Sequence, residues 1–183
     1  MSDAALAAKA QTKSGPRMLV IRTVLTLVFA AAVIPFAPRI ARAFAYYGFH
    51  PHGPDQAIWA GLAPQIKIHI AAAVLAFAIG FILMLRPKGV GLHKTMGWMW
   101  VAAMGATAVS SFFITGLNGD AFSLIHLLSG WTVVALPMAV YAIRRRDVML
   151  HRRFMTGLFF GGMVIAGLLA FLPGRVMYMM FFG

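Results

Sequence analysis

Five long apolar stretches constrain the fold of this chain more than any other feature of its sequence. A helix needs about 20 apolar residues to cross the hydrocarbon core of a bilayer. Stretches near that length occupy approximately residues 18–36, 66–85, 94–115, 122–143 and 154–172. The sequence therefore predicts an all-α membrane protein with five transmembrane helices. It also predicts a cytoplasmic N-terminal tail at residues 1–17 and a single membrane domain at residues 18–183.

The composition agrees with a membrane location and excludes several kinds of site. Hydrophobic residues make up 61% of the chain and charged residues only 11%, so lipid must solvate much of the surface. The chain has four Asp, none within the apolar stretches, and no Glu. A transporter usually carries a carboxylate at membrane depth, which disfavours that class. The absence of cysteine excludes disulfides, thiolate metal sites and covalently attached c-type haem.

Basic residues predict the orientation of the chain. Twelve Lys and Arg lie on the side of the N-terminus and four on the opposite side, which indicates an N-in, C-out, multi-pass protein of the bacterial inner membrane. These residues lie at the ends of apolar segments and not on one polar face, so they indicate contact with the lipid bilayer and no nucleic acid. The long connection at residues 37–65 falls outside, and its aromatic residues suit the membrane–water boundary.

The last four apolar segments contain a repeated pattern of histidines. His69 and His93 are 24 residues apart, and His126 and His151 are 25 apart. The second histidine of each pair has similar neighbours, in Leu92-His93-Lys94 and Leu150-His151-Arg152. The pattern predicts a duplicated helical hairpin, so that the last four helices form a four-helix bundle.

The alternating direction of these helices predicts two layers of histidines. His69 and His126 fall near the outer face, and His93 and His151 near the inner face, with roughly 25 Å between the layers. Two facing imidazoles can bind a haem iron from both sides, an arrangement typical of electron transfer. The sequence thus predicts two haem b groups, with the four histidines as iron ligands. Basic residues that can contact the haem propionates are Lys67 outside and Lys94, Arg152 and Arg153 inside.

Small residues follow the histidines at helical spacing. Ala73, Ala76 and Gly80 follow His69, and would let a flat macrocycle approach the helix. Gly97 and Gly130 each lie one turn after a histidine. The same residues are equally suited to close helix packing, and histidines near headgroups also hydrogen-bond to water, lipid phosphate or carbonyls.

Several motifs resemble a known family. They are Leu92-His93-Lys94, Ser110-Ser111-Phe112-Phe113, Phe122–Leu128, Leu150–Arg153 and Ala166-Gly167 leading to Leu172-Pro173-Gly174-Arg175. Over about residues 66–180 they are similar to small prokaryotic membrane proteins catalogued as domain of unknown function 2306, a resemblance that implies a membrane fold but no activity. The helix and histidine arrangement also resembles ascorbate-reducible two-haem cytochromes b. Here the sixth helix and an ascorbate-binding motif are missing, so that group's donor and acceptor do not carry over.

Two hypotheses about function follow. The first is a b-type cytochrome-like protein or subunit that passes electrons across the membrane or to quinone. The alternative is a non-catalytic accessory subunit of a larger respiratory or photosynthetic membrane complex, in which the histidines are structural. Absorption of visible light by bound haem would distinguish the two.

Overall fold

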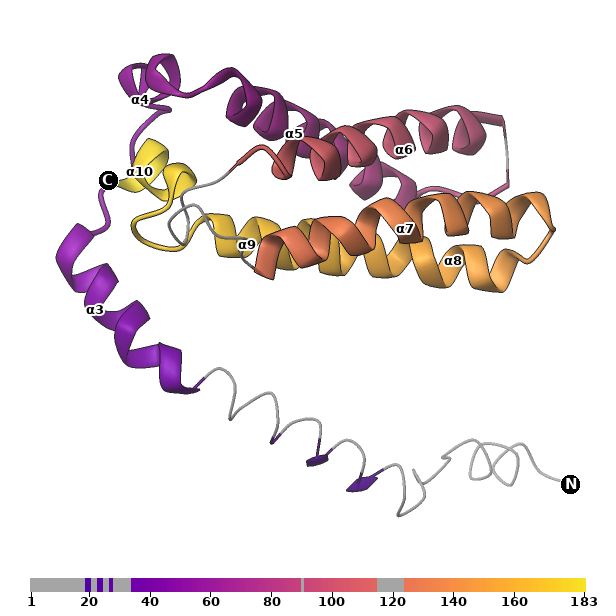
Figure 1. Cartoon of the computed structure of the whole chain (residues 1–183), viewed down its shortest axis with the longest axis horizontal. Coiled ribbons are helices and arrows are strands. Elements are labelled where there is room, and N and C mark those ends of the chain that lie inside the picture. Colours follow the sequence, from indigo (N-terminus) through magenta and orange to yellow (C-terminus); the bar gives the residue numbers. More distant parts are fainter. Residues whose placement is uncertain (1–18, 21–22, 25–26, 28–33, 90, 115–123) are drawn as a thin grey trace, which may run out of the picture. The chain divides into compact units, whose positions relative to one another are not determined.

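The computed structural model describes residues 19–20, 23–24, 27, 34–89, 91–114 and 124–183 (Figure 1). These residues form helices and connecting turns, with no strand among them. The chain divides into two compact units, Met1–Gly48 and Phe49–Gly183, which are described separately. Most of the first predicted span, at residues 18–36, and residues 115–123, which include Asp120, lie outside the described residues.

The described part of the first unit ends in an amphipathic helix. A 3-10 turn, η1 (Ile34–Phe36), leads into α3 (Ala37–Tyr47), which has a proline in its first turn. Arg39, Arg42 and Tyr46 are spaced three and four residues apart and share one face of α3. The helix ends at Gly48, where φ is +69° and the N–H donates to the carbonyl of Phe44 at 3.0 Å.

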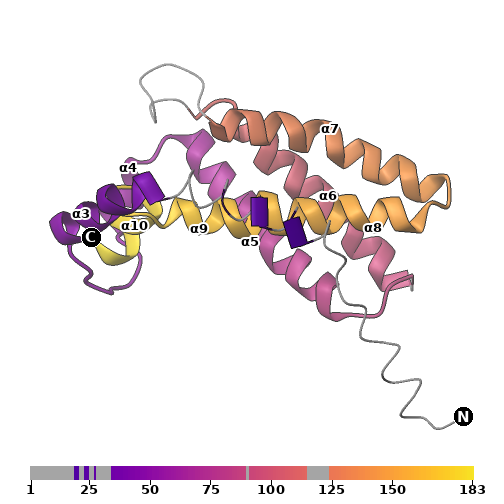
Figure 2. The same cartoon turned by 90° about the horizontal axis from the view of Figure 1, so that it is seen from below.

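Four long helical segments form the second unit (Figures 1 and 2). They are α5 (Pro64–Leu85), α6 (Gly91–Ser111), α7 (Leu124–Arg144), and a continuous fourth helix made of α8 (Val148–Gly157), η2 (Leu158–Ile165) and α9 (Ala166–Ala170). α5 contacts α6, α6 contacts α7, α7 contacts α8, and η2 contacts α5. The contacts therefore close a ring, and the predicted bundle of two successive helical hairpins is present.

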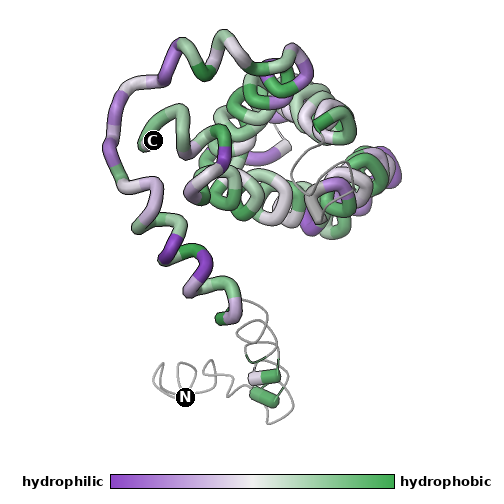
Figure 3. The backbone as a smooth tube through the Cα atoms, turned by 60° about the vertical axis from the view of Figure 1, so that its left-hand side comes forward, coloured by the Kyte–Doolittle hydropathy of each residue, from purple (hydrophilic) through white to green (hydrophobic). Residues whose placement is uncertain are grey.

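Within the described residues, three helices are long and apolar enough to cross a membrane: Pro64–Leu85, His126–Arg144 and Val148–Ala170. Figure 3 shows hydrophobic residues, in green, along the helices of the bundle. α6 has comparable length, with 21 residues, but is less apolar because it carries His93 and Lys94. The all-helical membrane fold is confirmed, whereas the count of five spans and the N-in orientation stay predictions.

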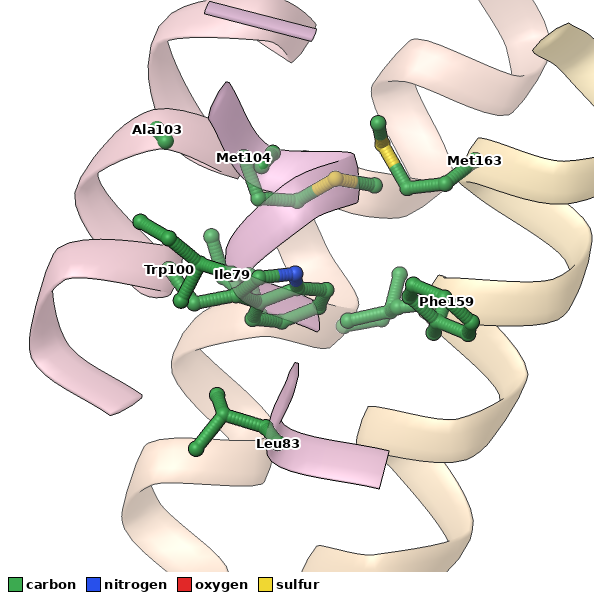
Figure 4. Close-up of a cluster of buried hydrophobic side chains, with 11 residues drawn as sticks. Ile79, Leu83, Trp100, Ala103, Met104, Phe159 and Met163 are labelled. Carbon is green, nitrogen blue, oxygen red and sulfur yellow. The ribbon is translucent and has the colours of Figure 1, made fainter. Parts of the chain in front are cut away.

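The middle of the bundle is filled by large side chains. Trp100 from α6 and Phe159 from η2 meet beside Ile79 of α5 (Figure 4), and each of the three is at most 5% exposed. A Cβ atom at Gly80 would lie 2.6 Å from both Trp100 Nε1 and Phe159 Cδ2. Gly80 therefore allows the two rings to approach the α5 backbone, which a larger residue would prevent.

A π-helix interrupts the fourth helix at η2 (Leu158–Ile165). The wider turn changes which residues face inward, and Leu158, Phe159 and Met163 become buried. Each of these side chains belongs to the cluster at the centre of the bundle. The π segment therefore fits the fourth helix to the core that α5 and α6 provide.

A cap closes one end of the second unit. The last residues form a short helix, α10 (Val176–Phe182), and α4 (Gln56–Gly61) packs against it. Three N–H groups donate to carbonyls in the last turn of α10: His50 to Phe182 at 3.0 Å, His52 to Phe181 at 2.9 Å and Asp55 to Met180 at 3.0 Å. Terminal helix carbonyls need such partners. Tyr178, only 1% exposed, lies inside this cap.

Candidate histidine sites at the ends of the bundle

The four histidines of the repeat lie on inward-facing parts of their helices. His126 of α7 is itself buried, with 5% exposed. The other three start stripes that become buried at spacings of four and seven residues. These stripes are His69 with Ala76 and Leu83, His93 with Trp100 and Met104, and His151 with Leu158. The histidines therefore continue the core toward both ends of the bundle.

Helix direction places the histidines in two groups. His69 and His126 lie in early turns of α5 and α7, at one end of the bundle, and His93 and His151 begin α6 and α8 at the other end. In the ring of contacts, α5 and α7 are separated by other helices, and so are α6 and α8. Each group therefore comes from helices on opposite sides of the bundle interior.

Main-chain carbonyls of neighbouring helices orient two of the rings. Nδ1 of His69 is 3.0 Å from the carbonyl of Thr107 and 3.1 Å from Ser110 Oγ. Nδ1 of His151 is 2.9 Å from the carbonyl of Ala139. A carbonyl only accepts hydrogen bonds, so each Nδ1 carries the proton and the lone pair of the neutral ring lies on Nε2. Thr107 and Ala139 were absent from the sequence prediction because any residue type supplies a main-chain carbonyl.

His93 and His151 share one end of the bundle, where His93 lies in the first turn of α6 and His151 in the first turn of α8. Nδ1 of His93 is buried and has no hydrogen-bond partner among the described residues. A hollow of about 220 Å³ adjoins this ring, lined by Leu83, Arg86, Pro87, Leu92, His93 and Met96.

Hydroxyl groups lie at the end of the bundle that carries His69 and His126. Ser110, Ser111, Ser129 and Thr132 are all buried. Ser111 Oγ is 2.8 Å from the carbonyl of Ala108 and bonds to Ser129 Oγ on α7, while Thr132 Oγ1 donates to Leu128 at 2.9 Å. Such bonds to the same helix satisfy polar groups inside a membrane protein. The interior at this end of the bundle is therefore polar, although the surrounding helices are apolar.

The four predicted basic residues differ in what they contact. Lys67 donates to the carbonyl of Ala60 at 3.1 Å, and its ammonium lies 6.0 Å from the centre of the Trp59 ring. It therefore helps to hold α4. Lys94, Arg152 and Arg153 are exposed at the end of the bundle that carries His93 and His151. His93 and His151 thus have more exposed cations near them than His69 and His126.

Of the small residues that follow His69 on α5, Ala76 and Gly80 pack in the core of the bundle. Ala76 is fully buried, and Trp100 and Phe159 fill the space beside Gly80. The sequence predicted that a flat macrocycle could approach α5 from His69 to Gly80. The space beside Gly80 is already filled, so this surface is shorter than predicted. In contrast, a Cβ atom at Gly97 or Gly130 would meet no atom within 4 Å. Open space thus remains one turn after His93 and one turn after His126.

No group of three or more His, Cys, Asp or Glu side chains converges in the described part of the chain. A metal ion bound by protein side chains alone usually has at least three such ligands. Two histidines at one end of the bundle therefore supply fewer ligands than a metal ion bound by protein alone usually has.

Comparisons with known proteins identify the chain at the level of a family. A family model described as "Predicted membrane protein (DUF2306)" matches residues 66–181, which is more than half of the chain. The match runs from the first turn of α5 to the last turn of α10. No curated protein and no solved structure matches the chain.

Proposed function

Because the chain belongs to the DUF2306 family of predicted membrane proteins, whose description gives no activity, we propose a function from its histidines. The protein is a b-type cytochrome-like electron-transfer protein or subunit of the bacterial inner membrane. It holds two haem b groups, one between His69 and His126 and one between His93 and His151. It passes electrons across the membrane or to quinone, for a larger membrane complex.

The observation that carries this proposal is the hydrogen bonding of His69 and His151. Each donates its Nδ1 proton to a main-chain carbonyl of a neighbouring helix, at 3.0 and 2.9 Å. Metal-binding histidines usually have such a partner, which fixes the ring and directs the Nε2 lone pair to the metal. The two bonds occur once at each end of the bundle, as two separate sites require.

The number of histidines at each end favours haem over a bare metal ion. A porphyrin supplies four ligands to its iron, so the protein needs to provide only two. Haem held between two histidines would supply one-electron transfer and would not bind oxygen. The open space beside Gly97 and Gly130 is where a flat ring has room next to a histidine.

Charge supports the same assignment at the inner end. Haem propionates are anionic, and Lys94, Arg152 and Arg153 are exposed near His93 and His151. Lys67 can contribute at the outer end, although it already donates to Ala60. The chain's own residues would thus bind the iron, orient the imidazoles and neutralise the propionates.

Visible spectroscopy tests the proposal. The full chain is expressed with added haem precursor and purified in mild detergent. We expect a Soret band with low-spin α and β bands on reduction, and about two haems per chain. His126→Ala should remove one of the two signals, and His151→Ala the other. His50→Ala, a histidine of the outer connection, is the matched control and should keep both. Purified protein without haem would contradict the proposal.

The alternative is a non-catalytic accessory subunit of a respiratory or photosynthetic complex. One observation favours it, because the bonds from His69 to Thr107 and from His151 to Ala139 each join two helices. They would stabilise the bundle without any cofactor. Purification of a stable complex in which this chain carries no haem would support this function.

A further inference from the structure

A groove runs between α6 and α7 at the end of the bundle where the chain passes from α7 to α8. It encloses about 340 Å³ and is lined by Trp98, Val101, Leu136, Pro137, Val140, Tyr141 and Arg144. The volume falls in the lower range of ligand-binding pockets. Leu136 is 6% exposed, whereas Trp98 and Tyr141 are 57% and 63% exposed. The groove therefore opens on the surface that faces lipid.

The groove is apolar inside and positively charged at one end. Val101, Leu136, Pro137 and Val140 give it an apolar interior, and Trp98 and Tyr141 are aromatic residues of the kind that settle at membrane boundaries. Arg144 is the only charged residue that lines it. An apolar channel with a cation at its mouth matches an amphiphile that has an acyl chain and a negative head.

The arginines at this mouth form no ion pair with an acidic side chain in the described part of the chain. The guanidinium of Arg145 lies 5.9 Å from the centre of the Tyr141 ring, next to the groove. Asp147, the nearest carboxylate in sequence, accepts a hydrogen bond from the N–H of Leu150 at 2.9 Å and caps α8. The other carboxylate side chain in the described part of the chain belongs to Asp55, which precedes α4 at the opposite end of the bundle. Their charge is thus available to an external anion.

The turn after α7 holds the backbone of this cluster in place. The N–H of Asp147 donates to Ala142 at 2.9 Å and that of Arg146 to Ile143 at 3.0 Å, while φ of Arg146 is +63°. These are the bonds of a Schellman ending, in which one left-handed residue closes the helix. Local bonds therefore fix the path on which Arg144 and Arg145 lie, which lowers the entropy cost of binding.

We propose that the groove between α6 and α7 binds one anionic phospholipid. One acyl chain lies between Val101, Leu136 and Val140, and the phosphate contacts Arg144 and Arg145. Basic pockets between transmembrane helices are suited to anionic headgroups, and arginine donates two parallel hydrogen bonds to a phosphate. A zwitterionic lipid has no net charge to match the two cations. The site is separate from the histidines, so it is independent of haem binding.

Native mass spectrometry of the full chain in mild detergent tests the proposal, with phosphatidylglycerol and phosphatidylethanolamine as the added lipids. We expect one phosphatidylglycerol to bind about tenfold more tightly than phosphatidylethanolamine. The double variant Arg144→Gln, Arg145→Gln should lower the affinity for phosphatidylglycerol by about thirtyfold, since each of the two cations contributes roughly 1 kcal/mol and about 1.4 kcal/mol is tenfold. Lys88→Gln is the matched control. It removes a charge at the same end of the bundle but outside the groove, and it should change affinity less than twofold.

A second variant tests the apolar part of the groove. Val140→Trp fills the channel without a change in charge, and we expect it to lose the bound lipid while its helix content by circular dichroism stays unchanged. Equal binding of the two lipids would overturn the proposal, as would an equal loss in Lys88→Gln and in the double arginine variant. Retention of phosphatidylglycerol by folded Val140→Trp would overturn it too. If Val140→Trp does not fold, the arginine variants and their control decide alone.

Discussion

Gly80 shows how a single residue sets the distance between helices in this bundle. Its missing side chain makes room for Trp100 from α6 and Phe159 from η2 on the same turn of α5. Both rings are rigid and nearly fully buried, so neither can turn away from an added atom. A methyl group at this position must therefore displace a helix.

Gly80→Ala is expected to destabilise the bundle by about 1–3 kcal/mol, the usual cost of overpacking a core. The measurement is the apparent melting temperature in detergent, followed by circular dichroism. Gly167→Ala is the matched control, because a Cβ atom there would meet nothing within 4 Å. It should be neutral or slightly stabilising, since alanine favours helix. Equal melting temperatures for the two variants would show that Trp100 and Phe159 do not pack on Gly80.

Arg146 is the one described non-glycine residue with a positive φ, at +63°. This conformation costs an L-residue about 1–2 kcal/mol, and glycine adopts it without penalty. Arg146→Gly should therefore stabilise the hairpin between α7 and α8 by about 1 kcal/mol. The apparent melting temperature in lipid-free detergent measures the change. Arg145→Gly removes the same charge one residue earlier, at an ordinary φ, and should not stabilise the protein.

Histidines illustrate what the sequence can and cannot predict about single residues. Their spacing predicted which ends of which helices carry them, because that depends only on chain direction and helix length. The partners of His69 and His151 are carbonyl oxygens, which every residue has. The residue types at positions 107 and 139 therefore do not indicate that their carbonyls bind a histidine. Binding of haem stays a prediction.

At the scale of elements, the cap formed by α10 and residues 49–55 is the main feature that the sequence did not predict. The sequence shows only that Val176–Gly183 is too short to cross a membrane. Its partner lies far away along the chain, as the 3.0 Å contact between His52 Nε2 and the main-chain oxygen of Gly183 illustrates. Local patterns predicted the four long helices well, because each has its own apolar run. A pairing between distant segments has no such local signal.

Hydrogen exchange tests the cap. The amides of His50, His52 and Asp55 donate to α10 and should exchange slowly for a connecting segment. Met179→Pro breaks α10, because it removes the N–H that donates to Arg175 at 2.9 Å, and should speed exchange in residues 50–55. Val176→Pro is the control, since proline is tolerated at the first position of a helix. Unchanged exchange in Met179→Pro would show that the segment does not depend on α10.

For the whole molecule, the absence of cysteine makes the predicted orientation directly measurable. Gly53→Cys places a thiol in the connection predicted to lie outside, and Lys88→Cys places one between α5 and α6 at the predicted inner face. A membrane-impermeant maleimide should label the first variant in intact spheroplasts. It should label the second only after permeabilisation. The reverse pattern would show that the excess of basic residues does not set the orientation.

The carbonyl partners of His69 and His151 have a consequence for sequence variation. A hydrogen bond to a main-chain oxygen survives any substitution that leaves the helix intact, so the side chains at Thr107 and Ala139 are free to change. Members of the family can therefore diverge at these two positions and still hold both imidazoles in the same orientation. Proline is the exception, because it would bend the helix that supplies the oxygen.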